Sequence, residues 1–187
     1  MLFKPPEALP RLPNSSLTSV FLGGVIEEGR ATNWQTQLTQ TMTKAFGEDG
    51  VIILNPRRDD WDDSWVQSIH DEQFRFQVSW ELTAQEGADV RAYVFLPDFK
   101  APITLMELGL FVKMPKTIVY CPEGYWRKGN VDIVCNRYSP VEAGCVFEDW
   151  QEFEHRLIGL VQDAEIEKTL KKDAKMVNQT IRTFRGA

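Results

Sequence analysis

The sequence lacks several features that would assign a function directly. None of its apolar runs approaches the roughly 18 residues of a membrane-spanning helix, and the N-terminal region has no apolar segment of signal-peptide length. The two histidines and three cysteines do not have the spacing of a metal site. No GxGxxG or Walker sequence follows a predicted strand. We therefore expect no membrane contact, no metal and no other cofactor.

The chain also has fewer basic than acidic residues, 21 against 27. The formal net charge is −6, which argues against binding to nucleic acids or anionic membranes and leaves a small-molecule partner open. The odd number of cysteines, Cys121, Cys135 and Cys145, favours reduced thiols and a cytoplasmic location. None of them has a histidine nearby in sequence, so we do not expect a thiol nucleophile.

What the chain does have is the material for one folded domain. Its 187 residues, with 43% hydrophobic and 26% charged residues, suit a globular protein with a sizeable core. We predict an irregular, proline-rich arm at residues 1–17, a folded domain at residues 18–165 and a basic helical tail at residues 166–187. The tail charges predict either a solvated helix face or a surface for an acidic partner.

Short apolar runs alternate with helical segments. Strands are predicted at 19–22, 51–54, 90–96, 117–120 and 131–135. Helices are predicted at 34–46, at 71–86, at 102–113 and from Glu148 or Asp149 onward. This alternation is typical of a parallel sheet covered on both faces. We predict an α/β fold, a flavodoxin-like or Rossmann-like doubly wound domain with a five-stranded parallel sheet, whose ligands bind beyond the carboxyl ends of the strands.

Glu107 is the most informative single residue. It is the only charged residue in the predicted helix from Pro102 to Val112, and no cation lies three or four residues away. A carboxylate among apolar neighbours is costly to bury without a partner. A fold retains such a group if a distant partner satisfies it or if chemistry requires it, and we interpret Glu107 as catalytic.

Glu81 is a candidate second carboxylate. It falls three residues after Val78 and seven after Phe74, which places it on their apolar helical stripe and predicts that it points inward. Two inward carboxylates on neighbouring helices suit paired acid/base or nucleophile/acid work. The alternative is that Glu81 pairs with a structural cation such as Arg75 or Arg91.

Two loops at predicted strand ends are candidates for ligand binding. Gly23 and Gly24 allow either a close approach of a ligand to the backbone or only a tight turn. The loop at 57–65 offers Arg57 and Asp59 for hydrogen bonds and Trp61 or Trp65 for stacking on a flat heterocycle. Its alternative interpretation is a solvated turn with aromatic anchors.

Several of these segments together resemble nucleoside 2-deoxyribosyltransferases and their close relatives. The resemblance spans residues 18–140, and its most specific part is Glu107-Leu108-Gly109 after a strand that ends in Leu96-Pro97-Asp98. The other matching segments are Phe21-Leu22-Gly23-Gly24, Asn55-Pro56-Arg57-Arg58-Asp59, Trp80-Glu81 and Pro102-Ile103-Thr104-Leu105-Met106.

The resemblance implies a flavodoxin-like enzyme that cleaves the N-glycosidic bond of (deoxy)nucleosides or nucleotides. By this resemblance Glu107 attacks the anomeric carbon and forms a covalent sugar ester, and Glu81 donates a proton to the base. The sugar then passes to another base or to water. The two-carboxylate logic is that of retaining glycosidases. The partners implied are a nucleoside or nucleotide and a nucleobase.

The chain departs from the family at two positions. The family aspartate that holds the sugar falls on Ala101, for which Asp98 or Asp59 is a candidate replacement, and the family tyrosine that orients the nucleophile falls on Phe21. The resemblance also implies a homo-oligomer with sites near subunit interfaces, where Asn136 is the nearest match to the residue lent by a neighbouring subunit. An alternative function is a non-catalytic nucleotide or sugar-nucleotide binding module on the same fold.

Overall fold

A parallel sheet forms the centre of the protein. The computed structural model describes residues 1–12, 15–26, 33–62, 64–141 and 144–185, so part of the predicted arm (13–14) and one residue of the 57–65 loop lie outside the described residues. The strands are β1 (Leu2–Phe3), β2 (Thr18–Gly24), β3 (Val51–Leu54), β4 (Val90–Val94), β5 (Thr117–Tyr120) and β6 (Val146–Phe147). The helices are α1 (Trp34–Phe46), α2 (Glu72–Gly87), α3 (Pro102–Phe111), α4 (Lys128–Tyr138) and α5 (Trp150–Arg185).

The strand order confirms the predicted α/β fold. The six strands lie in the order β1-β3-β2-β4-β5-β6, and every pairing is parallel. Without β1, the order along the chain is second, first, third, fourth, fifth, which is the flavodoxin-like arrangement. The predicted count of five strands is wrong, because β1 adds a sixth at the edge beside β3.

One predicted strand is helical, and the arm predicted to be irregular contains a short strand. Residues 131–135, predicted as a strand, lie within α4, where Val131 and Cys135 are buried one helical turn apart and Ile133 between them is 69% exposed. The last strand is instead β6, which has only two residues. The N-terminal arm is not wholly irregular either, because the Asn55 N–H donates to the Phe3 carbonyl at 3.0 Å in the β1–β3 pairing.

The helix starts follow their capping residues. The Asn33 side chain accepts a hydrogen bond from the Thr36 N–H at 3.1 Å at the start of α1, as is typical of a helix cap. Asp71 caps α2 in the same way through the Phe74 N–H at 2.9 Å. The α3 helix begins with Pro102 at its first position, where a missing N–H costs nothing.

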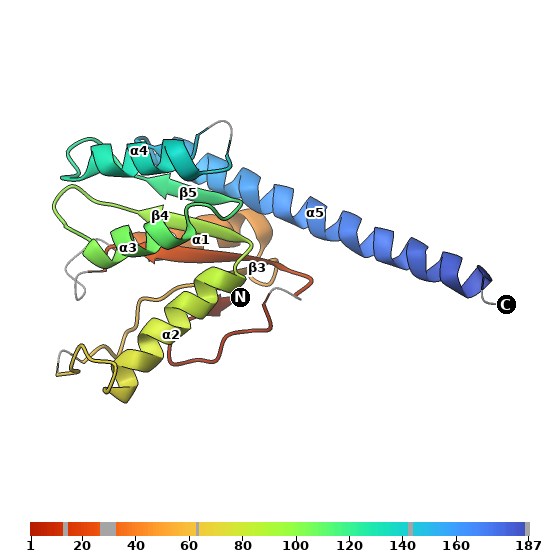
Figure 1. Cartoon of the computed structure of the whole chain (residues 1–187), viewed down its shortest axis with the longest axis horizontal. Helices are drawn as coiled ribbons and strands as arrows, with labels where there is room; N and C mark the ends of the chain where they lie inside the picture. The colour runs from red at the N-terminus through yellow and green to blue at the C-terminus, as the bar shows by residue number, and fades with distance from the viewer. Residues whose placement is uncertain (13–14, 27–32, 63, 142–143, 186–187) are drawn as a thin grey trace.

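Helices cover both faces of the sheet (Figure 1). Val20 and Leu22 of β2 belong to the core shared with α1 and α5, whereas Phe21 between them packs with Trp80 and Ala84 of α2. The α3 helix lies beside α2 and is followed by α4 in the same layer (Figure 1). Alternate β2 side chains therefore enter opposite cores, as a strand buried on both faces requires.

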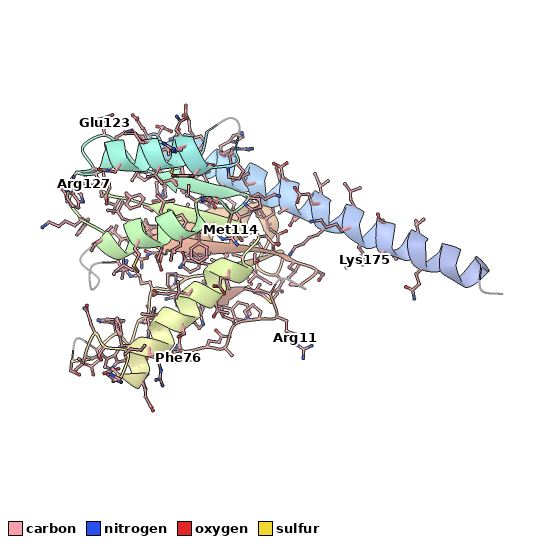
Figure 2. The ribbon with its side chains drawn as sticks, in the orientation of Figure 1. Arg11, Phe76, Met114, Glu123, Arg127 and Lys175 are labelled. Carbon is pink, nitrogen blue, oxygen red and sulfur yellow. The ribbon has the colours of Figure 1, made fainter. Side chains whose placement is uncertain are left out.

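The last helix extends well beyond the sheet (Figure 1). Its first turns carry core residues such as Phe153 and Leu157, whereas Leu170 and Lys175 are exposed, and Figure 2 shows Lys175 on the projecting part. Lys168 is not a solvated residue, because its Nζ donates to Asp89 Oδ2 at 2.6 Å. No helix in the described part of the chain is long and apolar enough to cross a membrane.

Candidate active site

Glu107 is buried in the layer between α2 and the sheet. Its side chain is only 7% exposed, although α3 supplies no partner for it. Ala101, which caps this helix, adopts a left-handed backbone with φ of 46° and makes no side-chain capping bond. The carboxylate therefore depends on groups from other elements, as its apolar surroundings in the sequence indicated.

Gln85 of α2 satisfies Glu107. The Gln85 Nε2 amide donates to Glu107 Oε1 at 2.8 Å, and the Tyr93 hydroxyl of β4 donates to Gln85 Oε1 at 2.5 Å. Gln85 and Tyr93 are fully buried. Neither residue has a predicted role from the sequence. Their hydrogen bonds form a chain from β4 of the sheet to Glu107.

Arg91 holds the end of α2 in place. Its Nε donates to the Gln85 carbonyl at 2.6 Å and its Nη2 to the Glu86 carbonyl at 3.2 Å. These carbonyls belong to the last turn of the helix, which has no further residues to satisfy them. The alternative pairing of Glu81 with Arg91 is therefore wrong, and no ion pair joins Glu81 to a cation among the described residues.

Glu81 lies between two glutamines on α2. Gln77, Glu81 and Gln85 are spaced four residues apart, so they share one face of the helix. The Gln77 Nε2 amide donates both to Glu81 Oε1 at 2.6 Å and to the Pro56 carbonyl at 3.0 Å. The Glu81 side chain is half-buried, although Phe74 and Val78, which predicted its direction, are themselves only half-buried.

Burial raises the pKa of both carboxyl groups, and the Glu107 charge adds to the shift at Glu81. Burial raises the pKa of Glu81 from 4.5 to about 8, and the Glu107 charge raises it further, against the hydrogen bond from Gln77. Burial also raises the pKa of Glu107 from 4.5 to about 7, against the hydrogen bond from Gln85. Near neutral pH the pair therefore holds about one proton, with Glu81 as the preferred carrier.

Three buried polar atoms that have no partner among the described residues lie around the loop after β3. They are Gln35 Nε2, Arg58 Nη1 and Gln77 Oε1. Gln35 accepts from Arg57 Nη1 at 3.4 Å, so this half-buried arginine lies between the start of α1 and the loop. Unsatisfied buried polar atoms are uncommon in folded proteins, and this group lies at the carboxyl end of β3, beside Glu81.

The two glycines after β2 are explained by packing. A side chain at Gly23 would place its Cβ 2.8 Å from the Tyr93 ring and 3.0 Å from the Phe21 ring. At Gly24, where φ is 155°, the Cβ would lie 2.6 Å from the Val94 carbonyl oxygen. Both positions therefore exclude larger residues even without a ligand, and their predicted contact with substrate stays a prediction.

The 57–65 loop is a surface turn with aromatic anchors. Asp59 pairs with Lys4 at 2.8 Å, and its side chain is 81% exposed. Arg58 makes a two-pronged contact with Asp60 at 2.8 and 2.7 Å and lies over the Trp65 ring. Trp61 packs edge-on against Trp65 and is 38% exposed.

Two other predicted binding residues do not join the carboxylates. Asp98 is exposed in the turn after β4, and Asn136 is exposed on α4. The three cysteines are free and buried, and no group of three or more potential metal ligands occurs among the described residues.

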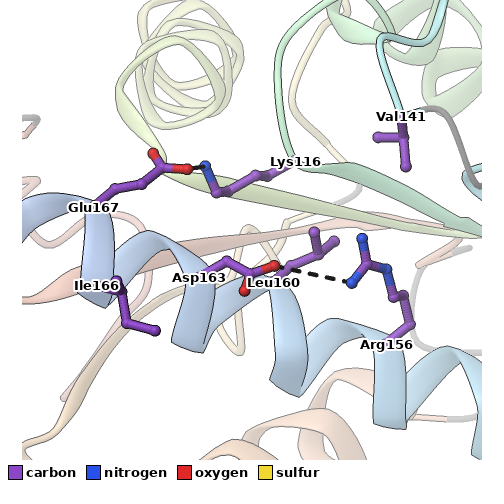
Figure 3. Close-up of a pocket in the computed structure, with 7 residues that line it drawn as sticks. All are labelled: Lys116, Val141, Arg156, Leu160, Asp163, Ile166 and Glu167. Atoms are coloured by element: carbon purple, nitrogen blue, oxygen red, sulfur yellow. Dashed lines mark hydrogen bonds and ion pairs between the residues drawn. The ribbon is translucent and has the colours of Figure 1, made fainter.

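A groove lies elsewhere in the fold. It encloses about 580 Å³ between α5 and the residue that precedes β5, Lys116, and Figure 3 shows its ion pairs, Lys116 with Glu167 and Arg156 with Asp163. Because Lys116 lies at the amino end of β5, this groove is at the edge of the sheet opposite the ligand-binding edge of such folds. A smaller cavity of about 310 Å³ separates α3 from α4, and Gly109 and Arg127 help to line it.

Fold and site together define an α/β protein with two interacting carboxyl groups, the buried Glu107 and the half-buried Glu81, in the helical layer over a flavodoxin-like sheet. Residues 17–125 match the family model described as "Nucleoside 2-deoxyribosyltransferase like", and the chain belongs to that family. Membership indicates an enzyme whose substrates are nucleosides and nucleobases. No curated protein matches the chain.

Proposed function

We propose that the protein cleaves the N-glycosidic bond of (deoxy)nucleosides or nucleotides through a covalent sugar ester on Glu107. The observation that carries this proposal is the buried Glu107 carboxyl group, which the Gln85 amide holds and which raises the pKa of a second carboxyl group, Glu81, above its own. This difference in pKa favours Glu107 as the nucleophile and Glu81 as the acid.

The first half-reaction releases a nucleobase. A carboxylate oxygen of Glu107 forms a bond to the anomeric carbon as the bond from that carbon to the base nitrogen breaks. The electron pair of the breaking bond goes to the nitrogen, which takes the proton of Glu81. The transition state carries oxocarbenium character, which a nearby carboxylate stabilises. The base leaves neutral, and Glu81 becomes a carboxylate.

The second half-reaction frees Glu107. An acceptor base or a water molecule attacks the anomeric carbon, the ester bond to Glu107 breaks and its electrons return to the carboxylate. Glu81 accepts the proton that the acceptor loses, which restores the starting state. Transfer to a base defines a deoxyribosyltransferase, and transfer to water defines an N-glycosidase.

Binding of the substrate is proposed at the carboxyl ends of β2, β3 and β4. Gln77, whose amide binds both Glu81 and the Pro56 carbonyl, has an Oε1 without a partner among the described residues, and Arg57 follows Pro56 in the chain. Both residues support a contact with base or phosphate there. Contacts from Gly23, Gly24, Asp59, Trp61 and Asp98 remain predictions, as do a homo-oligomer and the contribution of Asn136 across a subunit interface.

The experiment is base release from a panel of nucleosides and nucleotides, followed by chromatography with and without a second base. Glu107→Gln is expected to abolish release, because the neutral amide cannot form the ester. Glu86→Gln is the matched control, since Glu86 is an exposed carboxylate on α2. Unchanged turnover in Glu107→Gln would show that the proposal is wrong.

A second candidate function is a nucleotide or sugar-nucleotide sensor that has lost catalysis. The observation in its favour is Ala101, which offers no carboxylate at the position where the family holds the sugar. The same panel separates the two functions. Ligands that raise the melting temperature without any release of base support the sensor, and release of base excludes it.

A further inference from the structure

We propose that Tyr93 and Gln85 act together as positioning residues for Glu107, replacing the tyrosine that this chain lacks at Phe21. This inference rests on the proposed function of Glu107 as nucleophile. It assigns to β4 and α2 a task for which Phe21 of β2 carries no hydroxyl group in this protein.

The sheet register explains how the hydroxyl group can come from the neighbouring strand. Gly23 of β2 pairs with Tyr93 of β4, and the missing Cβ of Gly23 leaves the space that the Tyr93 ring fills, beside the Phe21 ring. The phenolic group thereby reaches Gln85 from the face of the sheet that Phe21 shares. A side chain at Gly23 would close this route.

The hydrogen bonds in the chain have a fixed direction. Tyr93 donates to Gln85 Oε1, so the amide must turn its Nε2 donor toward Glu107. Arg91 fixes the Gln85 backbone through its carbonyl. The carboxylate therefore always meets a donor, which favours its ionised form and holds Oε1 in place. Oε2 stays available to attack the substrate.

The charges around Glu107 do not provide this orientation by themselves. Among the described residues, the titratable groups that face it are Glu81 from α2 and Tyr93 from β4, with Arg91 beyond Tyr93. Burial and the Glu107 charge raise the pKa of Tyr93, so its hydroxyl remains a donor throughout the physiological range. The Glu107 charge helps to raise the pKa of Glu81, so Glu81 is the preferred carrier of the proton near neutral pH, and the Gln85 amide is the group that favours the ionised form of Glu107.

The decisive variants are Tyr93→Phe, which keeps the ring, and Gln85→Met, which removes the amide. Both are expected to lower kcat by about 10–100-fold with little change in KM, because the nucleophile is misplaced rather than removed. Thr117→Val is the control for the loss of a buried hydroxyl, since Thr117 donates to the Phe111 carbonyl at 3.1 Å from the amino end of β5.

The pKa of Glu107 gives a readout that does not depend on activity. It is measured by NMR titration of labelled glutamate carboxyl groups, with the signal assigned by its absence in Glu107→Gln. Both variants are expected to raise this pKa by about half a unit or more, because the charged form loses its donor, and Thr117→Val is expected to leave it unchanged.

The two measurements separate the two proposals. If Tyr93→Phe and Gln85→Met leave both the pKa of Glu107 and kcat at the wild-type values, the positioning role is wrong. If the pKa rises in both variants while the wild-type protein releases no base from any substrate, the hydrogen-bonded chain stands and the proposed enzymatic function fails.

Discussion

Replacing Glu107 by glutamine is expected to stabilise the folded protein in a pH-dependent way. The folded pKa is about 7, against an ordinary value of 4.5. Between these values the folded state binds more protons than the unfolded state, so the wild-type protein loses stability as the pH rises. Glutamine keeps the acceptor for Gln85 but has no proton to lose.

The size of the effect follows from the pKa difference. A difference of about 2.5 units between the folded value of about 7 and the ordinary 4.5 corresponds to about 3.5 kcal/mol at about 1.4 kcal/mol per unit. The advantage of Glu107→Gln should be small at pH 4, grow through the window from 4.5 to 7 and then level off. For a chain of this length, about 3.5 kcal/mol corresponds to a rise in melting temperature of roughly 7–14 °C.

The assay is thermal and urea unfolding of both proteins, followed by circular dichroism, in steps from pH 5 to pH 8.5. Glu86→Gln controls for the loss of one exposed negative charge. A stability difference that does not change with pH, or a variant that is less stable at pH 8, would show that Glu107 ionises in the folded protein as it does in water. Glu107 would then lack the raised pKa on which its proposed pairing with Glu81 depends.

Other substitutions test the packing around two glycines and the ion pair that joins α5 to Asp89. Gly23→Ala is expected to cost about 1–3 kcal/mol of unfolding free energy through overpacking, because the added Cβ would lie 2.8 Å from the Tyr93 ring. Gly109→Ala, whose Cβ meets no atom within 4 Å, is expected to stabilise α3 by up to about 1 kcal/mol. Lys168→Met is expected to destabilise the protein by about 1–3 kcal/mol, since Asp89 loses the ammonium 2.6 Å away, whereas the exposed Lys175→Met is expected to have little effect. Urea unfolding measures all four, and equal values within either pair would contradict the packing or the ion-pair argument.

The fold was largely predictable because its central strands are continuous apolar runs. Each of the runs at 51–54 and 117–120 is part of the sheet and follows a helix with a clear start, at Asn33 for α1 and at Pro102 for α3. The strand predicted at 131–135 was wrong because the apolar residues of this run fit a strand as well as one turn of a helix. The two-residue strands β1 and β6 are too short for any periodicity, and tertiary pairing alone defines them.

The candidate site was predictable only where one residue carried the information. Glu107 was conspicuous because its helix offers no cation. Gln85 and Tyr93 were not, because their role depends on how α2 approaches β4. The replacement for Phe21 comes from another strand, and only the β2–β4 register reveals it. The spacing of Gln77, Glu81 and Gln85 was visible in the sequence and was the one available signal of a polar helix face.

The two glutamines hold their carboxyl groups with different rigidity. Gln85 has its carbonyl oxygen bound to Tyr93, its amide bound to Glu107 and its backbone bound to Arg91. The amide of Gln77 is equally engaged, but its Oε1 is buried without a partner. In the proposed reaction Glu107 attacks one fixed carbon, whereas Glu81 must protonate a leaving base and later accept a proton from a different acceptor. A locked neighbour suits the first task, and a neighbour with an unused acceptor atom suits the second, because that atom can bind an N–H group of whichever base is present. The asymmetry of the hydrogen bonds therefore follows the division of labour between the two carboxyl groups.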